Sequence, residues 1–322
     1  MTTIVTVTPN PALDVCAEVP TVEADHKLHC AHADRTPGGG GINVARAIHR
    51  LGGAATAIFP FGGSTGALLC DLLAGEGVPI VGVPVASTTR EDFSVRETTT
   101  GHEYRFVLPG LPLDPSEVAR CIEEVVQHAH AGSFVVISGS MPPGVDTDAI
   151  EAIVGPLRAA GSHLVVDTSG PALTTFARLG VHLLKPSLHE LVNHAGRELT
   201  AMDDIIDAAN DLRRSGPNIA VVVSLGADGA VLVTDSQPPC IVETPPIPVV
   251  SAVGAGDSLV AGLVLGLAHG EALIDATRRG VAAGSAATMS AGHHLCRAPD
   301  VELLLPDVRA TPLETGRIAA SP

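Results

Sequence analysis

The chain has 322 residues, of which 45% are hydrophobic, so it is long enough and apolar enough to bury a large core. Its formal net charge of −16 argues against general binding to nucleic acids or to anionic membranes. The first residues carry no basic leader, and the apolar run Leu259 to Ala268 is too short to span a bilayer, so we expect a cytoplasmic protein.

Short apolar runs rich in β-branched residues alternate along the chain with amphipathic segments. The predicted strands are Ile4 to Thr8, Ala55 to Phe59, Phe134 to Ser138, Leu164 to Asp167, Val181 to Leu184 and Ala220 to Ser224. The predicted helices include Val44 to Leu51, Pro115 to Ala131, Thr147 to Ala160 and Asp203 to Arg214. This alternation predicts an α/β fold with a mainly parallel sheet flanked by helices.

Two polar stretches, residues 14–36 and 85–108, interrupt that alternation. The second contains the alternating segments Phe93 to Glu97 and Tyr104 to Leu108, which predict short antiparallel strands outside the main sheet. We expect these stretches to form a small β lid, with residues 1–13, 37–84 and 109–309 as the α/β core. Residues 310–322 are expected to be a flexible tail.

The first candidate ligand loop is Pro37 to Asn43, which contains four consecutive glycines and precedes a predicted helix. A run of glycines loses much backbone entropy on folding, and a plain linker is the alternative. The helical spacing of Ile42, Ala45 and Ile48 favours a ligand loop at the start of a helix.

A second candidate loop is Gly254 to Asp257, directly before the apolar run that begins at Leu259. Glycines let the backbone approach a ligand, and the first N–H groups of a helix favour phosphate. Asp257 would repel that phosphate unless it has a chemical task, such as taking a proton from an attacking hydroxyl. A well-capped core helix is the alternative.

Polar residues follow several predicted strands, and parallel sheets bind ligands at the carboxyl ends of their strands. Asp14 follows the first strand through a short loop, Ser138 and Ser224 end two others, and Lys185 follows a fourth. The chain has 17 arginines but two lysines, Lys27 and Lys185, and both lie in candidate site segments. The strand ends therefore predict one cleft with compact cations near a phosphate.

Together these motifs resemble those of the ribokinase-like (PfkB) sugar kinases, over nearly the whole chain. The matching segments are Thr8 to Asp14, Gly38 to Arg46, Ser138 to Gly144, Ser224 to Gly229 and Gly254 to Asp257. The resemblance implies a Rossmann-type α/β core with a small β-sheet lid. Within the family the chain looks most like the minor bacterial 6-phosphofructokinases, because 1-phosphofructokinases and tagatose-6-phosphate kinases usually carry lysine where this chain has Gly40.

The resemblance implies a glycolytic enzyme that transfers phosphate from ATP to the C1 hydroxyl of fructose 6-phosphate, with Mg²⁺ and, as a further candidate, K⁺. Asp257 would be the general base, and the N–H groups of Gly254, Ala255 and Gly256 would bind the transferring phosphoryl group. The implied substrate residues are Asp14, Lys27, Gly38, Gly39, Asn43, Arg90, Arg105 and Ser138, with Lys27 and Arg90 on the substrate's own phosphate. The implied nucleotide residues are Lys185, Ser187, Ser224, Gly226, Gly229, Val249, Val281 and Ser285. Glu190 is implied as an indirect Mg²⁺ ligand, and a K⁺ loop near Ser251, Val253, Ala287 and Gly292.

Several of these roles have plainer alternatives. Asn43 could be a helix-start residue, Ser138 a strand-end hydrogen-bonding group and Arg105 a solvated lid charge. The chain also departs from the family's pattern, with Ser187 where asparagine is usual and His189 where the most similar members usually carry lysine. A low-turnover sensor of sugar phosphates or nucleotides is therefore a second hypothesis, and a kinase for tagatose 6-phosphate or fructose 1-phosphate is a third.

A small lid sheet on its own would expose apolar area and open strand edges. Tyr104 and Phe106 contribute to that area. We therefore expect the homodimer through the lid that the family implies, with no nucleic-acid or membrane partner.

Overall fold

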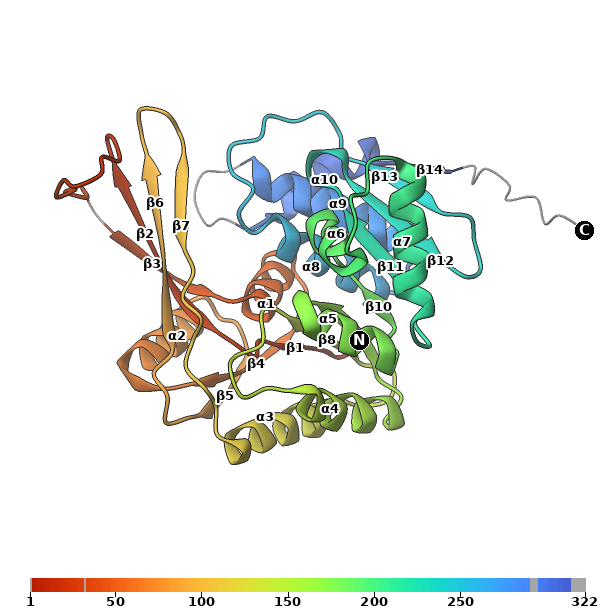
Figure 1. The fold of residues 1–322 in the computed structure, drawn as a ribbon, viewed down its shortest axis with the longest axis horizontal. Helices are drawn as coiled ribbons and strands as arrows, with labels where there is room; N and C mark the ends of the chain where they lie inside the picture. The colour runs from red at the N-terminus through yellow and green to blue at the C-terminus, as the bar shows by residue number, and fades with distance from the viewer. Residues whose placement is uncertain (1, 32, 290–294, 314–322) are drawn as a thin grey trace, which may run out of the picture.

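The computed structural model describes residues 2–31, 33–289 and 295–313, which form a large α/β body with a small sheet projecting from it (Figure 1). The strands of the body are β1 (Ile4–Val7), β4 (Thr56–Phe61), β5 (Ile80–Pro84), β8 (Phe134–Ser138), β9 (His163–Asp167), β10 (Leu183–Leu184), β11 (Ala220–Ser224), β12 (Ala230–Thr234), β13 (Cys240–Glu243) and β14 (Arg309–Pro312). They form one ten-stranded sheet in the order β14-β13-β12-β11-β10-β9-β8-β1-β4-β5. Neighbouring strands from β11 to β5 are parallel, and β12, β13 and β14 are antiparallel additions. The predicted fold class is confirmed.

Helices cover both faces of this sheet. They are α1 (Gly40–Arg50), α2 (Gly63–Gly75), α3 (Pro115–His128), α4 (Thr147–Ala159), α5 (Gly170–Leu179), α6 (Leu188–Ala195), α7 (Met202–Arg214), α8 (Ala255–Ala268), α9 (Leu273–Thr288) and α10 (Ala298–Leu304). One apolar cluster joins α1, α2, α8, α9 and α10 to the sheet, and the other joins α3 to α7. Alternate strand residues serve the two clusters, as Val136 and Val135 of β8 do. Among the described helices, none is long and apolar enough to cross a membrane.

The small sheet contains β2 (Ala12–Val19), β3 (Ala33–Gly38), β6 (Arg90–Glu97) and β7 (Glu103–Phe106), in the order β3-β2-β6-β7. We call it the lid sheet. Its two hairpins are antiparallel as expected, but β2 and β6 pair in parallel, so the expectation of only antiparallel strands is wrong. β2 and β6 follow β1 and β5, two strands of the same parallel sheet, and both therefore leave the body in the same direction.

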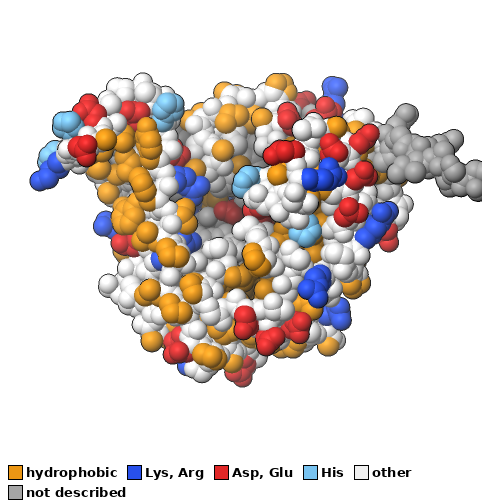
Figure 2. Space-filling view, in the orientation of Figure 1, with side chains coloured by type: hydrophobic (Ala, Val, Ile, Leu, Met, Phe, Trp, Pro, Cys, Tyr) orange, Lys and Arg blue, Asp and Glu red, His pale blue; other side chains and the backbone are white. Residues whose placement is uncertain are grey.

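The lid sheet has one apolar and one polar face, because successive side chains of a strand alternate. In register across the strands, Val15 lies beside Phe93 and Phe93 beside Phe106, whereas Asp14 lies beside Asp92. Figure 2 shows hydrophobic side chains gathered over the lid. Phe93, Tyr104 and Phe106 are exposed there, so residues 2–31, 33–289 and 295–313 leave the apolar face uncovered.

Several boundaries differ from the sequence prediction, and two of the differences have a clear structural reason. Helix α1 begins at Gly40, inside the glycine run, and Gly39 precedes it with a φ of 103° that favours glycine. The predicted tail at 310–322 is wrong at its start, because Ala310 to Pro312 pair with β13. The open edge of β13 offers backbone groups that this segment satisfies. Residues 314–322 lie outside the described residues.

Candidate active site

A cavity of about 270 Å³ lies between the lid sheet and the carboxyl ends of the central strands. We call it the lid cavity, and Figure 2 shows the hollow beside the lid with acidic side chains on its floor. It is lined by Asp14, Gly39, Gly40, Asn43, Arg90, Asp92, Arg105, Val107, Ser138, Gly139, Ser140, Asp167, Thr168, Ser169, Glu190 and Asp257. Most of the predicted substrate residues are therefore in one place.

A second cavity of about 370 Å³, which we call the α8–α9 cavity, lies beside helices α8 and α9. Its lining includes six of the predicted nucleotide residues, which are Ser224, Gly226, Gly229, Val249, Val281 and Ser285. The loop Thr244 to Ile247 also lines it, and sequence reasoning did not nominate this loop. At Gly229, φ is 95° and an added Cβ would lie 2.0 Å from the carbonyl oxygen of Val242, so only glycine fits.

The start of helix α8 joins the two cavities. Ala255 and Gly256 line the α8–α9 cavity, and the next residue, Asp257, lines the lid cavity. Gly254 precedes the helix in the left-handed conformation, with φ of 79°. The first-turn N–H groups of a helix have no intrahelical acceptor, so this turn presents donors and a positive dipole end.

Asp257 has the environment of a base that works near neutral pH. The Nδ2 group of Asn43 donates a hydrogen bond to Asp257 Oδ2 at 2.9 Å. Burial raises the pKa of Asp257 to about 7, and the charges of Asp167 and Asp14 act in the same direction. The Asn43 hydrogen bond and the charge of Lys185 oppose this rise and do not cancel it.

Lys185 is buried and lies 3.0 Å from Asp167, measured from Nζ to Oδ1. Burial alone would lower the pKa of Lys185, but the charge and hydrogen bond of Asp167 hold it above its usual value. An added Cβ at Gly256 would lie 3.8 Å from Lys185 Nζ, so the ammonium group faces the start of α8. Sequence reasoning missed Asp167, although its position at the end of a predicted parallel strand was a usable signal.

The guanidinium group of Arg90 is held by its neighbours on one side. Nη1 donates to both carboxylate oxygens of Asp92 at 2.7 Å and to the carbonyl of Leu108 at 2.8 Å. Nη2 donates to the carbonyl of Asn10 at 3.3 Å, and Nε is buried with no hydrogen-bond partner among the residues that the structure describes. Burial is the main reason that the pKa of Asp92 is raised. Sequence reasoning missed Asp92, whose side chain shares a strand face with Arg90 two residues away.

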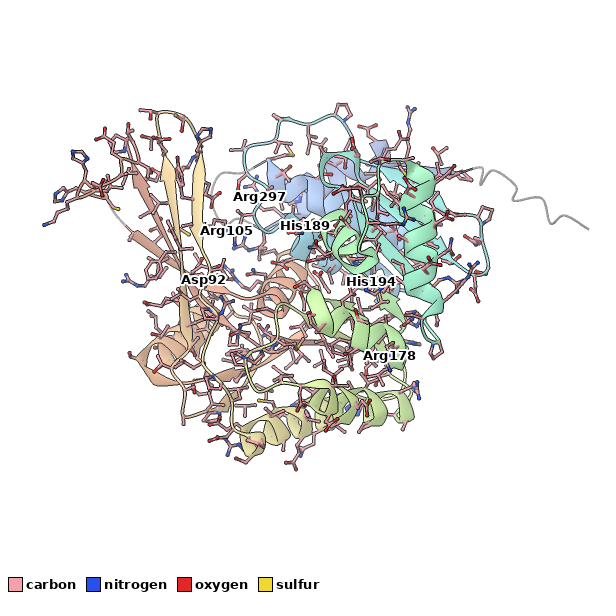
Figure 3. The ribbon with its side chains drawn as sticks, in the orientation of Figure 1. Asp92, Arg105, Arg178, His189, His194 and Arg297 are labelled. Carbon is pink, nitrogen blue, oxygen red and sulfur yellow. The ribbon has the colours of Figure 1, made fainter. Side chains whose placement is uncertain are left out.

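Of the other predicted substrate residues, Arg105 lines the lid cavity, whereas Gly38 and Lys27 do not. Arg105 lines the lid cavity, and Figure 3 shows it on the lid side of the gap with His189 on the side of the body. Gly38 supports Asp14, because an added Cβ there would lie 2.5 Å from Asp14 Oδ2. Lys27 is exposed on the loop between β2 and β3 and does not line the lid cavity. A single chain therefore does not bring Lys27 to the cavity that Arg90 lines, and the shared role of the two residues stays a prediction.

Ser187 and Glu190 form the cap of helix α6. Ser187 Oγ accepts from the Glu190 N–H at 3.2 Å, and Glu190 Oε2 accepts from the Ser187 N–H at 2.8 Å. Ser187 forms an isolated parallel β-bridge with Ser224 and does not line the α8–α9 cavity. Glu190 lines the lid cavity. The side chains of Ser187 and Glu190 therefore stabilise the start of α6, and Glu190 also lies at the lid cavity.

The predicted K⁺ loop is described in part. The Ser251 N–H donates to the Thr288 carbonyl at 3.3 Å, which holds this loop against the end of α9 next to Ala287. Val253 lies in the same loop before α8, and Gly292 lies outside the described residues. Within residues 2–31, 33–289 and 295–313, no group of three His, Cys, Asp or Glu side chains is arranged to hold a metal ion.

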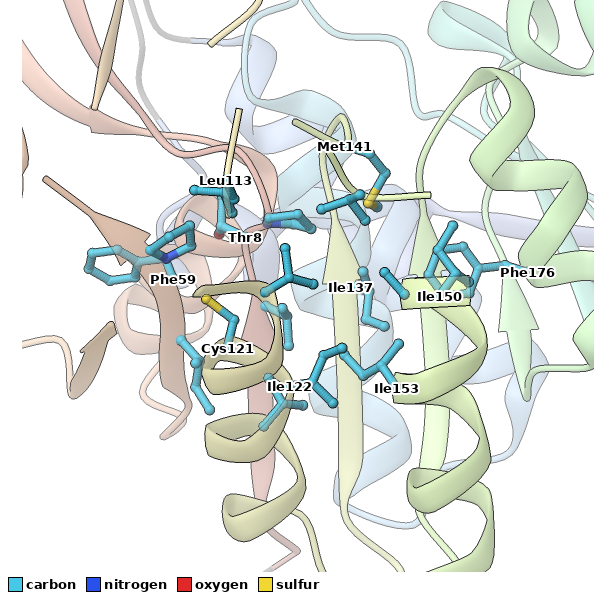
Figure 4. Close-up of a pocket in the computed structure, with 18 residues that line it drawn as sticks. Thr8, Phe59, Leu113, Cys121, Ile122, Ile137, Met141, Ile150, Ile153 and Phe176 are labelled. Carbon is cyan, nitrogen blue, oxygen red and sulfur yellow. The ribbon is translucent and has the colours of Figure 1, made fainter. Parts of the chain in front are cut away.

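A third cavity, of about 70 Å³, lies between the sheet and helices α3 and α4 (Figure 4). Its lining is apolar and includes Ile137, Met141 and Phe176. Burial raises the pKa of the neighbouring Cys121 thiol to about 11, so this thiol stays protonated and unreactive. The cavity is too small and too apolar for a phosphorylated ligand.

Several known proteins are similar in sequence to this chain over most of its length. ATP-dependent 6-phosphofructokinase isozyme 2 of Mycobacterium tuberculosis is 43% identical over 314 residues, which cover 98% of this chain and 92% of that protein. The protein of the same name from Escherichia coli is 44% identical over 303 residues, which cover 94% and 97%. A 1-phosphofructokinase from Rhodobacter capsulatus is 32% identical over 296 residues, which cover 91% and 92%.

Solved structures agree with these relatives. E. coli phosphofructokinase-2 in complex with potassium has a TM-score of 0.92 at 42% identity, with 95% of this chain and 99% of that chain covered. The same protein in complex with fructose-6-phosphate has a TM-score of 0.90 at 41% identity, with 96% and 99% covered. The model of the pfkB family carbohydrate kinases matches residues 11–300. This chain therefore belongs to the pfkB family of carbohydrate kinases.

Proposed function

We propose that this chain is an ATP-dependent 6-phosphofructokinase, which phosphorylates the C1 hydroxyl of fructose 6-phosphate to give fructose 1,6-bisphosphate. The observation that carries the proposal is the placement of two consecutive residues at the start of α8. Gly256 faces the α8–α9 cavity and Asp257 faces the lid cavity. A nucleotide in the first cavity and a sugar in the second would therefore meet at this turn.

In the reaction, Asp257 takes the proton of the attacking hydroxyl. The hydroxyl oxygen forms a bond to the γ-phosphorus, the bond from that phosphorus to the β–γ bridging oxygen breaks, and ADP leaves. The N–H groups at the start of α8 and the ammonium group of Lys185 stabilise the negative charge on the transferring phosphoryl group. A base with a pKa of about 7 is partly ionised at neutral pH and can still hold a proton.

The lid cavity offers groups for both ends of the sugar phosphate. Asp14, Asn43 and Ser138 would bind sugar hydroxyls, and Arg90 with Arg105 would bind the substrate's phosphate. The Nη1 side of Arg90 is held by Asp92, which leaves Nε and one Nη2 hydrogen to form paired bonds with an anion. Lys27 would contribute only from a second chain.

Mg²⁺ would accompany the nucleotide. The lid cavity has five carboxylates, Asp14, Asp92, Asp167, Glu190 and Asp257, but two arginines. Such a floor repels phosphates unless a cation screens them, and Mg²⁺ is commonly bound through phosphates and waters with few carboxylates. Glu190, which lines this cavity, would hold the ion's waters. K⁺ at the loop near Ser251 and Val253 is a further proposal, supported by the potassium complex of the E. coli protein.

A homodimer through the lid sheet completes the proposal. The exposed apolar face of the lid sheet supports a dimer. The structure of the tetrameric inhibited form of E. coli phosphofructokinase-2 has a TM-score of 0.90 at 42% identity, with 95% of this chain and 99% of that chain covered.

The test is an ADP-release assay with MgATP in potassium or sodium salts. The substrates are fructose 6-phosphate, tagatose 6-phosphate, fructose 1-phosphate and free fructose. Asp257→Asn should lower turnover by about 10²- to 10⁴-fold and keep substrate binding, because only proton transfer is lost. Asp275→Asn, on the exposed side of α9, is the matched control and should leave the rate unchanged.

Each alternative has its own outcome in this assay. Preference for another sugar phosphate would replace fructose 6-phosphate as the substrate. Sugar-phosphate binding without turnover would favour the sensor, a reading supported by the engagement of Ser187 in the α6 cap. Full activity of Asp257→Asn would reject Asp257 as the base.

A further inference from the structure

We infer that Arg46 and Glu76 are positioning residues, which orient the amide group of Asn43 so that its NH₂ faces Asp257. The inference rests on the proposed role of Asp257 as the base and adds two residues to the machinery behind it. Neither residue lines the lid cavity, so their effect passes through Asn43.

A continuous chain of hydrogen bonds links the four side chains. Arg46 Nη1 donates to Asn43 Oδ1 at 3.1 Å and to the carbonyl of Pro37 at 2.8 Å. Arg46 Nε and Nη2 donate to the two carboxylate oxygens of Glu76, at 2.8 and 2.6 Å. Asn43 Nδ2 then donates to Asp257 Oδ2 at 2.9 Å.

The chemistry of these groups permits one orientation of the amide. Arginine carries only donors, so the Asn43 atom that faces Arg46 must be its carbonyl oxygen. The NH₂ group is then on the side of Asp257, where it meets a carboxylate acceptor. Without Arg46 the amide can rotate by half a turn when Asp257 is protonated, because its oxygen then accepts from the acid O–H, whereas the same oxygen would repel the carboxylate.

The network is held rigidly because it starts from a buried ion pair. The Arg46 side chain is 3% exposed, whereas Glu76 is 31% exposed at the end of α2. A buried guanidinium group needs a partner, and Glu76 supplies one in fork geometry. Burial alone would raise the pKa of Glu76, but the hydrogen bond and charge of Arg46 hold it below its usual value, so the pair stays ionised near neutral pH.

The amide orientation matters because Asp257 stands among opposing charges. Asp167 from β9 and Asp14 from β2 favour its protonated form, as does burial, and Lys185 after β10 favours the carboxylate. The Asn43 hydrogen bond also favours the carboxylate. A rotated amide would therefore raise the pKa of Asp257 further and lower the fraction of its carboxylate form at neutral pH, without removing any group from the lid cavity.

The experiment measures the titration of Asp257 directly. Infrared spectra of the full chain are recorded across pH, and the spectrum of Asp257→Asn is subtracted to isolate the carboxyl band. In Arg46→Met, which keeps the length of the side chain and removes its donors, we expect the titration midpoint to rise by about one pH unit. The acid limb of kcat/KM should rise with it, and KM for ATP should not change.

Two further variants keep the test decisive. Arg279→Met makes the same substitution in a second, more exposed arginine–glutamate pair, in which Arg279 donates to both oxygens of Glu271, and it should leave the midpoint unchanged. Glu76→Gln should move the midpoint upward by a smaller amount, and it covers the case in which Arg46→Met does not fold. An unchanged midpoint in the folded Arg46 or Glu76 variants, or an equal shift in Arg279→Met, would overturn the inference.

The titration separates this inference from the proposed function. Because the infrared midpoint needs no turnover, a parent protein without kinase activity would reject the function and still report the effect of Arg46. Activity in the parent with no shift in Arg46→Met would instead keep the function and reject the positioning role.

Discussion

The four residues Asp257, Asn43, Asp167 and Lys185 come from separate segments and define the chemistry at the smallest scale. Asp167 pairs with Lys185 and raises its pKa, and it adds to the effect of burial in raising the pKa of Asp257. Asp257 is therefore a stronger proton acceptor than an exposed aspartate, while Lys185 remains cationic for the phosphoryl group. One carboxylate thus raises the pKa of both groups, which keeps Lys185 charged and favours the protonated form of Asp257.

This tuning predicts a pH profile. The active form of Asp257 is the carboxylate, and its pKa is raised to about 7. We expect kcat/KM for the sugar phosphate to fall as pH decreases through about 7, by close to tenfold per unit well below it. Rates measured from about pH 5 to about pH 9 check this, and an acid limb at the ordinary aspartate pKa would contradict the assigned environment.

The raised pKa of Asp257 also affects the stability of the folded chain. The folded chain binds the Asp257 proton more tightly than the unfolded chain, so ionisation between the unfolded pKa of about 4 and the folded pKa of about 7 works against folding. Asp257→Asn should accordingly be as stable as the parent protein at pH 8. A loss of turnover in that variant is then a loss of chemistry and not of fold.

Helix α8 shows how one element separates function from stability. Its first turn needs space for a ligand, whereas the rest is buried against α9 and α1. Gly256 is not in the left-handed region, and the nearest atom to an added Cβ is Lys185 Nζ at 3.8 Å. A side chain there would occupy ligand space and not protein space.

Gly256→Ala should therefore keep the fold and impair the nucleotide site. Alanine favours a helix over glycine by up to about 1 kcal/mol, so Tm should not fall. KM for ATP should rise at least about tenfold, because the methyl group overpacks the approach to the phosphates. Gly75→Ala at the end of α2, where an added Cβ meets nothing within 4 Å, is the control and should change neither quantity. A normal KM in Gly256→Ala would remove α8 from the phosphate site.

At the scale of the whole molecule, the lid sheet has two faces with different tasks. Its polar face supplies Asp14, Asp92 and Arg105 to the lid cavity. Its apolar face has exposed aromatic side chains that nothing in the described part of the chain covers. Sheet alternation makes the two tasks inseparable, since every residue directed to the cavity leaves its neighbours directed outward.

Phe106→Glu tests the proposed dimer. Phe106 is 58% exposed on the apolar face, and a carboxylate there would weaken a lid-to-lid interface at least about tenfold. The parent should sediment as a dimer or larger assembly, and the variant should shift toward monomer. Leu303→Glu, at a position 68% exposed on α10, should behave as the parent does. A monomeric parent at micromolar concentration would reject the dimer.

Local sequence was sufficient for the parts that depend on neighbours along the chain. The alternation of apolar runs predicted strands such as Phe134 to Ser138 and Ala220 to Ser224 with their observed bounds. The glycine loops predicted helix starts, and Asp257 stood out because a carboxylate beside an anion site needs a reason. Each conclusion needs only the period of one element or the chemistry of one turn.

The tertiary structure decided every contact between distant segments. Asp167 beside Lys185, Asp92 beside Asp14, and Arg46 joined to Glu76 follow from sheet order and helix docking, which local patterns do not contain. The same reason explains why the parallel pairing of β2 with β6 and the pairing of Ala310 to Pro312 with β13 were not predicted. The sequence by itself determined which chemical groups and elements are present, and the packing of the sheet determined which of those groups meet.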